Sequence, residues 1–194
     1  MSEEKPKKKN WFLLGCGGLI GLFIIIGVIS SCSKPSTKTS EDKGKTTSSP
    51  TSSQSATTVK MNEDLQVGDV KWKVLEANKE NSVGDNQYTK KQASGVFVVV
   101  KVSAELTGNK SGTVDSNQFE IIDSKNRTFK YSSEGQTAIE MSGKEGLFLK
   151  QVNPNVPIEG YLVFDIAKDA ENLKLKIKDL ELFSNKEGVV ELGI

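Results

Sequence analysis

Histidine is absent from this chain of 194 residues, and its cysteines lie near its start. The sequence contains no histidine, which excludes every mechanism that uses imidazole as a base or as a metal ligand. Its two cysteines, Cys16 and Cys32, both precede residue 33. A thiol nucleophile, a thiolate zinc site and an internal disulfide are therefore excluded from residues 33–194.

Two other patterns resemble catalytic motifs. The Ser-x-x-Lys spacing of acyl-transfer enzymes occurs at 31–34 and at 40–43, but that chemistry needs a helix in a rigid pocket, so we interpret both as chance. Glu134, Glu140 and Glu145 could supply paired carboxylates for glycoside hydrolysis. Three glutamates in a polar loop are more typical of a solvated surface. The sequence thus predicts no catalytic residue and no enzyme.

Oxygen ligands for calcium gather in two loops, Asp-Ser-Asn at 115–117 and Asp-Ser-Lys-Asn at 123–126. Calcium takes about six to eight oxygens at a defined spacing, and neither stretch continues as an EF-hand loop does. Turns rich in Asp and Asn form without any metal. The sequence therefore predicts no metal and no cofactor.

Two groups of residues are candidates for a contact surface. Residues 78–95 are expected to form a long loop, which is a common binding element on a rigid β-sandwich. It carries Tyr88, Lys90 and Lys91. A second group projects from one face of an expected strand and could touch anionic lipid or wall polymer: Lys174, Lys176 and Lys178. Their alternative interpretation is protection of an edge strand against pairing with other chains.

The small net charge of +1 hides a division along the chain. Residues 1–31 carry +2, residues 32–60 carry +3, and residues 61–194 carry −4. A nucleic-acid partner is not expected, because the folded part lacks the basic excess that phosphate binding needs.

An apolar run at 11–32 predicts attachment to a membrane. No charge occurs between Lys9 and Lys34, and about 20 apolar helical residues cross a bilayer core of about 30 Å. Lysines immediately before the run favour a cytoplasmic segment 1–10 and an outward C-terminal domain. A single-pass signal-anchor is one interpretation. The other is a lipoprotein signal, because Ile-Ser-Ser-Cys at 29–32 resembles a lipobox that would place a lipid on Cys32.

Residues 33–60 are predicted to form a flexible linker. Fifteen of these 28 residues are Ser or Thr and none is aromatic, so the segment cannot bury enough apolar area to offset its ordering entropy. Its root-mean-square span is expected to be about 30 Å.

Period-two alternation of apolar and polar residues predicts strands throughout residues 61–194. The expected strands are 70–74, 97–106, 119–121, 128–131, 147–149, 158–166, 173–177, 180–184 and 188–193. Only 133–142 favours a helix. Strands with one apolar face need a second sheet to cover them, which predicts an all-β, antiparallel sandwich of immunoglobulin-like type with Trp72 in its core.

Five short motifs within this region carry a resemblance to a family. They are Val-Gly-Asp at 67–69, Gly-Val-Phe-Val-Val-Val-Lys-Val at 95–102, Phe-Glu-Ile-Ile-Asp at 119–123, Gln-Val-Asn-Pro at 151–154 and Leu-Val-Phe-Asp-Ile at 162–166. In this order they resemble the telokin-like bacterial extracytoplasmic domain of unknown function. That family is similar in fold to the mycobacterial immunoprotective extracellular protein. The resemblance implies an anchored outward domain and supplies no catalytic residues.

The sequence therefore favours a membrane-tethered, extracytoplasmic domain that works by binding a protein or a cell-wall component. The alternative is an accessory or sensory subunit of a membrane complex, coupled to it through a transmembrane helix.

Overall fold

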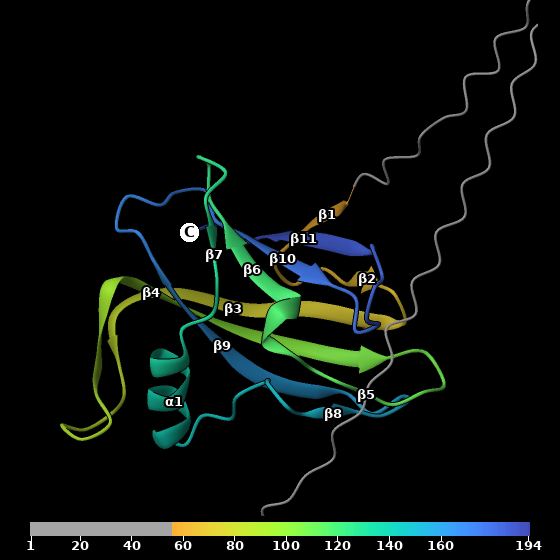
Figure 1. Cartoon of the computed structure of the whole chain (residues 1–194), viewed down its shortest axis with the longest axis horizontal. Helices are drawn as coiled ribbons and strands as arrows, with labels where there is room; N and C mark the ends of the chain where they lie inside the picture. Colours follow the sequence, from red (N-terminus) through yellow and green to blue (C-terminus); the bar gives the residue numbers. More distant parts are fainter. Residues whose placement is uncertain (1–55) are drawn as a thin grey trace, which may run out of the picture. The chain divides into compact units, whose positions relative to one another are not determined.

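The longest alternating runs form the two longest strands in the computed structural model, which describes residues 56–194. These strands are β3 (Val70–Val83) and β4 (Lys91–Leu106), and they pair antiparallel. The short β2 (Leu65–Val67) and the long β9 (Ile158–Ile166) flank them, which gives a sheet of order β2-β3-β4-β9 (Figure 1). Because successive side chains of a strand point to opposite faces, one face of this sheet is apolar.

A second sheet covers that apolar face and completes a β-sandwich (Figure 1). Its order is β1-β11-β10-β6-β7. The strands are β1 (Thr57–Lys60), β11 (Glu187–Glu191), β10 (Lys174–Lys178), β6 (Phe119–Ile122) and β7 (Thr128–Phe129). A separate pair consists of β5 (Gly112–Thr113) and β8 (Gln151–Val152), and the short 3-10 helix η1 (Ser116–Gln118) precedes β6.

The core between the sheets is built from the alternating positions. Trp72 is fully buried, as the sequence predicts, and its ring meets the ring of Phe119 edge-on with centroids 5.3 Å apart. One face of β4 lies in the same core: Val98, Val100, Val102, Ala104 and Leu106. Burial of this continuous apolar layer is the main force that holds the two sheets together.

Helix α1 (Ser133–Met141) confirms the single helix expected at 133–142. The hydroxyl of Ser132 caps it by accepting a hydrogen bond from the backbone N–H of Gly135 at 3.1 Å. The helix covers the outer face of β4 and β9, where a second, smaller core contains Phe97, Val99 and Val163. A Cβ on Gly135 would lie 2.7 Å from a methyl of Val163, so this close packing requires glycine.

Gln136 of α1 ties the helix to the outer edge of β9. Its side chain is buried, accepts a hydrogen bond from the backbone N–H of Val163 at 3.1 Å, and donates one to the carbonyl of Tyr161 at 3.0 Å. The amide thus takes the place of a neighbouring strand along part of this edge.

The prediction of a loop over 78–95 is wrong for most of these residues. β3 continues to Val83 and β4 begins at Lys91, so only residues 84–90 connect them. This extension is polar on both faces over much of its length, and the sequence lacks the alternation that marks a half-buried strand.

Two expected strands are also wrong. Residues 147–149 and 180–184 form turns, in which Leu149 and Phe183 have left-handed backbones with φ of 61° and 69°. The antiparallel prediction fails at one place, since β1 joins β11 in parallel. β1 also lies within 33–60, so the folded region begins before the predicted boundary at residue 61.

The predicted cytoplasmic segment 1–10, the apolar run 11–32 with Cys32, and the linker up to residue 55 lie outside the described residues. Within residues 56–194, no helix has the length and apolar character that a membrane span requires.

Candidate contact surface

The β3–β4 hairpin tip and helix α1 border a shallow, open hollow of about 400 Å³ on the surface, which we call the hairpin groove. Its lining residues come from both elements: Tyr88, Thr89, Lys90, Lys91, Ser133, Glu134, Thr137, Ala138 and Met141. The structure therefore brings the first predicted contact group, Tyr88, Lys90 and Lys91, into one site. It adds a helical wall that the sequence did not reveal.

A network of short hydrogen bonds holds the hairpin tip in one conformation. The side-chain oxygen of Asn86 accepts from the backbone N–H of Tyr88 at 2.9 Å, and the backbone carbonyl of Asn86 accepts from the backbone N–H of Lys90 at 2.7 Å. The carboxylate of Asp85 accepts from the hydroxyl of Thr89 at 2.9 Å. These bonds are typical of Asx turns, which fix a loop without a metal.

The hairpin groove carries two exposed apolar side chains beside charged ones. Tyr88 is 89% exposed and Met141 is 67% exposed. Lys91 and Glu134 form an ion pair of 3.0 Å between the two walls. Exposed Tyr and Met with a mixed polar rim are the composition of protein–protein contact sites.

The second predicted group lies elsewhere. Lys174, Lys176 and Lys178 are on β10, which lies between β11 and β6, so the interpretation as edge-strand protection is wrong. Each lysine contacts an acid on a neighbouring strand: Lys174 with Glu191 at 3.6 Å, Lys176 with Glu187 at 2.7 Å and Lys178 with Glu120 at 3.0 Å. Each of these lysines therefore faces an acid, although Lys178 shares Glu120 with Lys130, and none of the three lines the hairpin groove.

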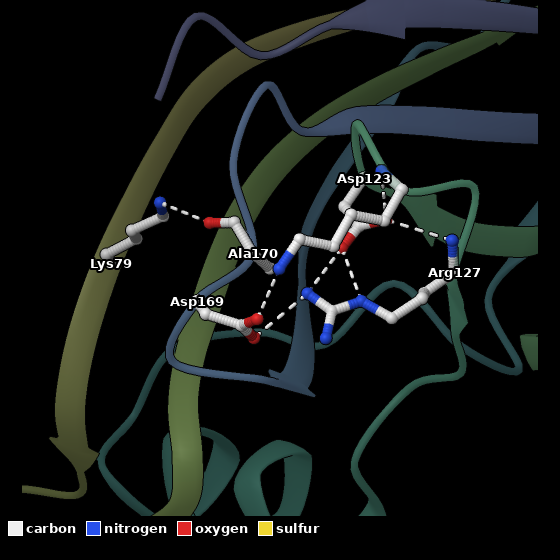
Figure 2. Close-up of polar contacts among 6 residues, drawn as sticks. Lys79, Asp123, Arg127, Asp169 and Ala170 are labelled. Carbon is white, nitrogen blue, oxygen red and sulfur yellow. Dashed lines mark hydrogen bonds and ion pairs between the residues drawn. The ribbon is translucent and has the colours of Figure 1, made fainter.

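The calcium candidate at 123–126 is a salt-bridged turn (Figure 2). The buried carboxylate of Asp123 accepts from the backbone N–H of Lys125 and of Arg127, both at 2.9 Å, and from Arg127 Nε at 2.7 Å. Asp169, on the β9–β10 connection, pairs with Arg127 at 3.0 Å and with Lys125 at 2.5 Å. This arrangement fastens the β6–β7 turn to that connection.

Both carboxyl groups of this network favour their ionised forms. Burial opposes ionisation of Asp123, but hydrogen bonds from Arg127 and Lys125 outweigh it and lower its pKa. Hydrogen bonds from Lys125 and then Arg127 lower the pKa of Asp169 to about 2. Carboxylates held ionised in this way stabilise the fold and are poor general acids.

Acid is therefore expected to weaken the domain by protonating this network. A carboxyl whose pKa is lower in the folded than in the unfolded state stabilises the fold above its unfolded pKa, and this contribution disappears as the pH falls towards its folded pKa. For Asp169 the window runs from the ordinary value of 3.8 down to about 2. In thermal melts, Asp169→Asn should lower the midpoint by a few degrees at pH 7 and by little at pH 2.

The control variant is Glu181→Gln, at an exposed acid outside the network. It should leave the melting temperature unchanged at both pH values. An Asp169→Asn deficit that stayed the same from pH 7 to pH 2 would contradict the assigned role.

The other carboxylates considered as calcium ligands or as catalytic pairs each have a different partner and form no common site. Asp115 caps η1 by accepting from Asn117 N–H at 2.8 Å. Glu134 pairs with Lys91, Glu140 accepts from Gln136, and Glu145 pairs with Lys150 at 2.6 Å. Within residues 56–194 no group of three or more Cys, Asp or Glu side chains is placed to hold a metal ion.

Solved structures share this fold. The YjhA protein from Bacillus subtilis has a TM-score of 0.51 at 15% identity, and the match covers 69% of this chain and 98% of that one. MPT63, a secreted protein from Mycobacterium tuberculosis, has a TM-score of 0.50 at 12% identity, with coverage of 72% and 99%. The putative lipoprotein YcdA from Bacillus subtilis has 0.50 at 13% identity, with coverage of 68% and 39%. No curated protein sequence matches significantly.

The likeness to MPT63 confirms the fold that the sequence motifs imply. A family model described as "Domain of unknown function (DUF4352)" matches residues 59–188, which include all five motifs. This match extends from β1 to the start of β11, so it takes in both sheets and α1. The chain therefore belongs to the DUF4352 family of domains of unknown function, and its fold is the β-sandwich that its motifs imply.

Proposed function

We propose that this protein is a non-catalytic binding module, tethered to the outer face of the cell membrane, that contacts a partner protein through the hairpin groove. The observation that carries the proposal is the pair of exposed side chains, Tyr88 and Met141, beside a hollow of about 400 Å³. Exposed apolar side chains that gather at one site, rather than lying singly on the surface, mark contacts with other proteins.

The topology places the hairpin groove and the point where the chain enters the domain at opposite ends of the sandwich. The hairpin tip joins β3 and β4 at one end. Thr57, where β1 begins, pairs with Gly188 at the start of β11, and the turn before β11 contacts Gly68 at the other end of β3. The chain thus enters the domain at the end away from the groove (Figure 1), which leaves the groove accessible on a tethered domain.

The attachment follows from the apolar run 11–32, either as a single-pass anchor with the N-terminus inside or through a lipid on Cys32. Two proteins of the same fold support an extracytoplasmic location, since MPT63 is secreted and YcdA is a putative lipoprotein. An immunoglobulin-like sandwich in this position is a common scaffold for recognition by loops.

Site-specific photo-crosslinking in intact cells tests the proposal. A photoreactive amino acid at position 88 or 141 should give the same discrete protein adduct in the membrane fraction, because both side chains line one groove. Leu149 is a matched control, because it is 81% exposed and lies outside the groove. It should give no such adduct.

The proposal fails if neither groove position captures a protein. It also fails if position 149 captures the same adduct as the groove positions, because the contact would then not be specific to the groove.

A further inference from the structure

The turn between β10 and β11 presents the most exposed apolar pair of the described residues. Leu182 is 86% exposed and Phe183 is 101% exposed. Phe183 also has a left-handed backbone, with φ of 69°. A bulky residue in this conformation is strained and persists only where the surrounding structure imposes it, so the turn is a candidate for function.

Hydrogen bonds around the buried Asp179 hold this conformation. The carboxylate of Asp179, which is 8% exposed, accepts from the hydroxyl of Ser184 at 2.7 Å. The backbone N–H of Asp179 donates to the backbone carbonyl of Lys186 at 3.0 Å, and that of Ser184 donates to the backbone carbonyl of Glu181 at 3.2 Å. On the other side Asp179 packs against Gly68, where a Cβ would lie 2.2 Å from its carboxylate. The two apolar side chains are therefore held outward on a fixed base.

The chain enters the domain beside this turn. Ala56 and Thr57 line one hollow together with Asn185, Lys186 and Glu187, the residues that lead from the turn into β11. The residues before Ala56 connect the domain to the apolar run 11–32. The segment that connects the domain to the apolar run therefore joins the domain at this end.

The charged residues near the turn do not favour its binding to an anionic surface. The charged residues around it are Asp69, Lys110, Asp179, Glu181, Lys186 and Glu187, in which acids outnumber bases. Any association through this turn must therefore rest on its apolar side chains. Exposed Leu and Phe are suited to the boundary between lipid headgroups and acyl chains.

We propose that Leu182 and Phe183 insert into the outer interface of the bilayer to which the chain is tethered, and that this contact orients the domain with the hairpin groove outward. The inference rests on the membrane attachment in the proposed function. Because the chain enters the domain beside this turn, attachment through the apolar run 11–32 keeps the turn at high local concentration near the lipid. Two inserted side chains are then sufficient to bias the orientation.

Depth-dependent quenching in lipid vesicles tests this orientation. The full-length chain, with Trp11→Phe and Phe183→Trp, is reconstituted into phosphatidylcholine vesicles with or without brominated acyl chains. Trp72 remains as a constant, buried background. In vesicles of brominated lipid, most of the emission from position 183 should be quenched. In ordinary lipid, the emission from position 183 should lie at shorter wavelength than that of an indole in water. High salt should leave the quenching unchanged, because charge does not drive the contact.

Two matched variants define the outcome. Tyr88→Trp, in the same Trp11→Phe background, places an equally exposed indole at the opposite end and should not be quenched. Adding Leu182→Asp to the Phe183→Trp chain should abolish quenching at position 183. The inference is overturned if the protein floats with vesicles while positions 183 and 88 are quenched equally or not at all. Failure of the protein to float would overturn the attachment itself, and the inference with it.

Discussion

Trp72→Ala is expected to lower the free energy of unfolding of the domain by about 3–5 kcal/mol. The indole is fully buried between the two sheets and packs edge-on against Phe119, so truncation leaves a cavity in the centre of the core. Urea denaturation followed by circular dichroism measures the loss, since the substitution removes the domain's own tryptophan fluorescence.

Trp72→Phe is the matched control and should cost clearly less. The indole Nε1 has no hydrogen-bond partner among the described residues, so phenylalanine removes an unsatisfied donor while it keeps most of the apolar volume. Equal losses for the two variants would show that cavity volume at this position does not determine stability.

Gln136→Leu is expected to cost about 1–3 kcal/mol, although leucine is more apolar and fits a helix well. The substitution leaves the backbone N–H of Val163 buried without an acceptor. The carbonyl of Tyr161 loses less, because it also accepts from Leu147 at 3.2 Å. Thermal or urea denaturation gives the total loss, and amide hydrogen exchange at Val163 locates it.

Thr137→Leu is the control on the exposed side of the same helix and should change stability by less than about 0.5 kcal/mol. If Gln136→Leu left both stability and the exchange of the Val163 amide unchanged, the proposed closure of the β9 edge by Gln136 would be wrong.

The sequence predicts those parts of the fold that depend on local pattern. Alternation over 97–106 identifies which side chains of β4 face the main core, because strand geometry fixes a period of two. The only stretch that favours a helix, 133–142, forms α1, and its cap at Ser132 is likewise a local feature that lies within one turn. The absence of histidine, and of cysteine after Cys32, limits the chemistry without any structure.

Errors arise where a short apolar run has two possible local structures. Leu180, Leu182 and Phe183 fit a strand pattern, but their surroundings force a turn in which Phe183 adopts a left-handed backbone and Asp179 supplies the fixing hydrogen bonds. The polar end of β3 fits a loop, but pairing with β4 supplies the hydrogen bonds that make it a strand.

The sequence by itself determined that the C-terminal part of the chain is a β-sandwich without histidine or cysteine side chains, because composition and periodicity are properties of the chain. Only the tertiary structure decided that β10 is a central strand with paired lysines, because strand order is set by contacts distant in sequence. The hairpin groove needs Tyr88 and Met141 from separate elements, and the turn at Leu182 and Phe183 lies beside Thr57 only through the pairing of β1 with β11. Such juxtapositions depend on packing between segments that no local pattern encodes.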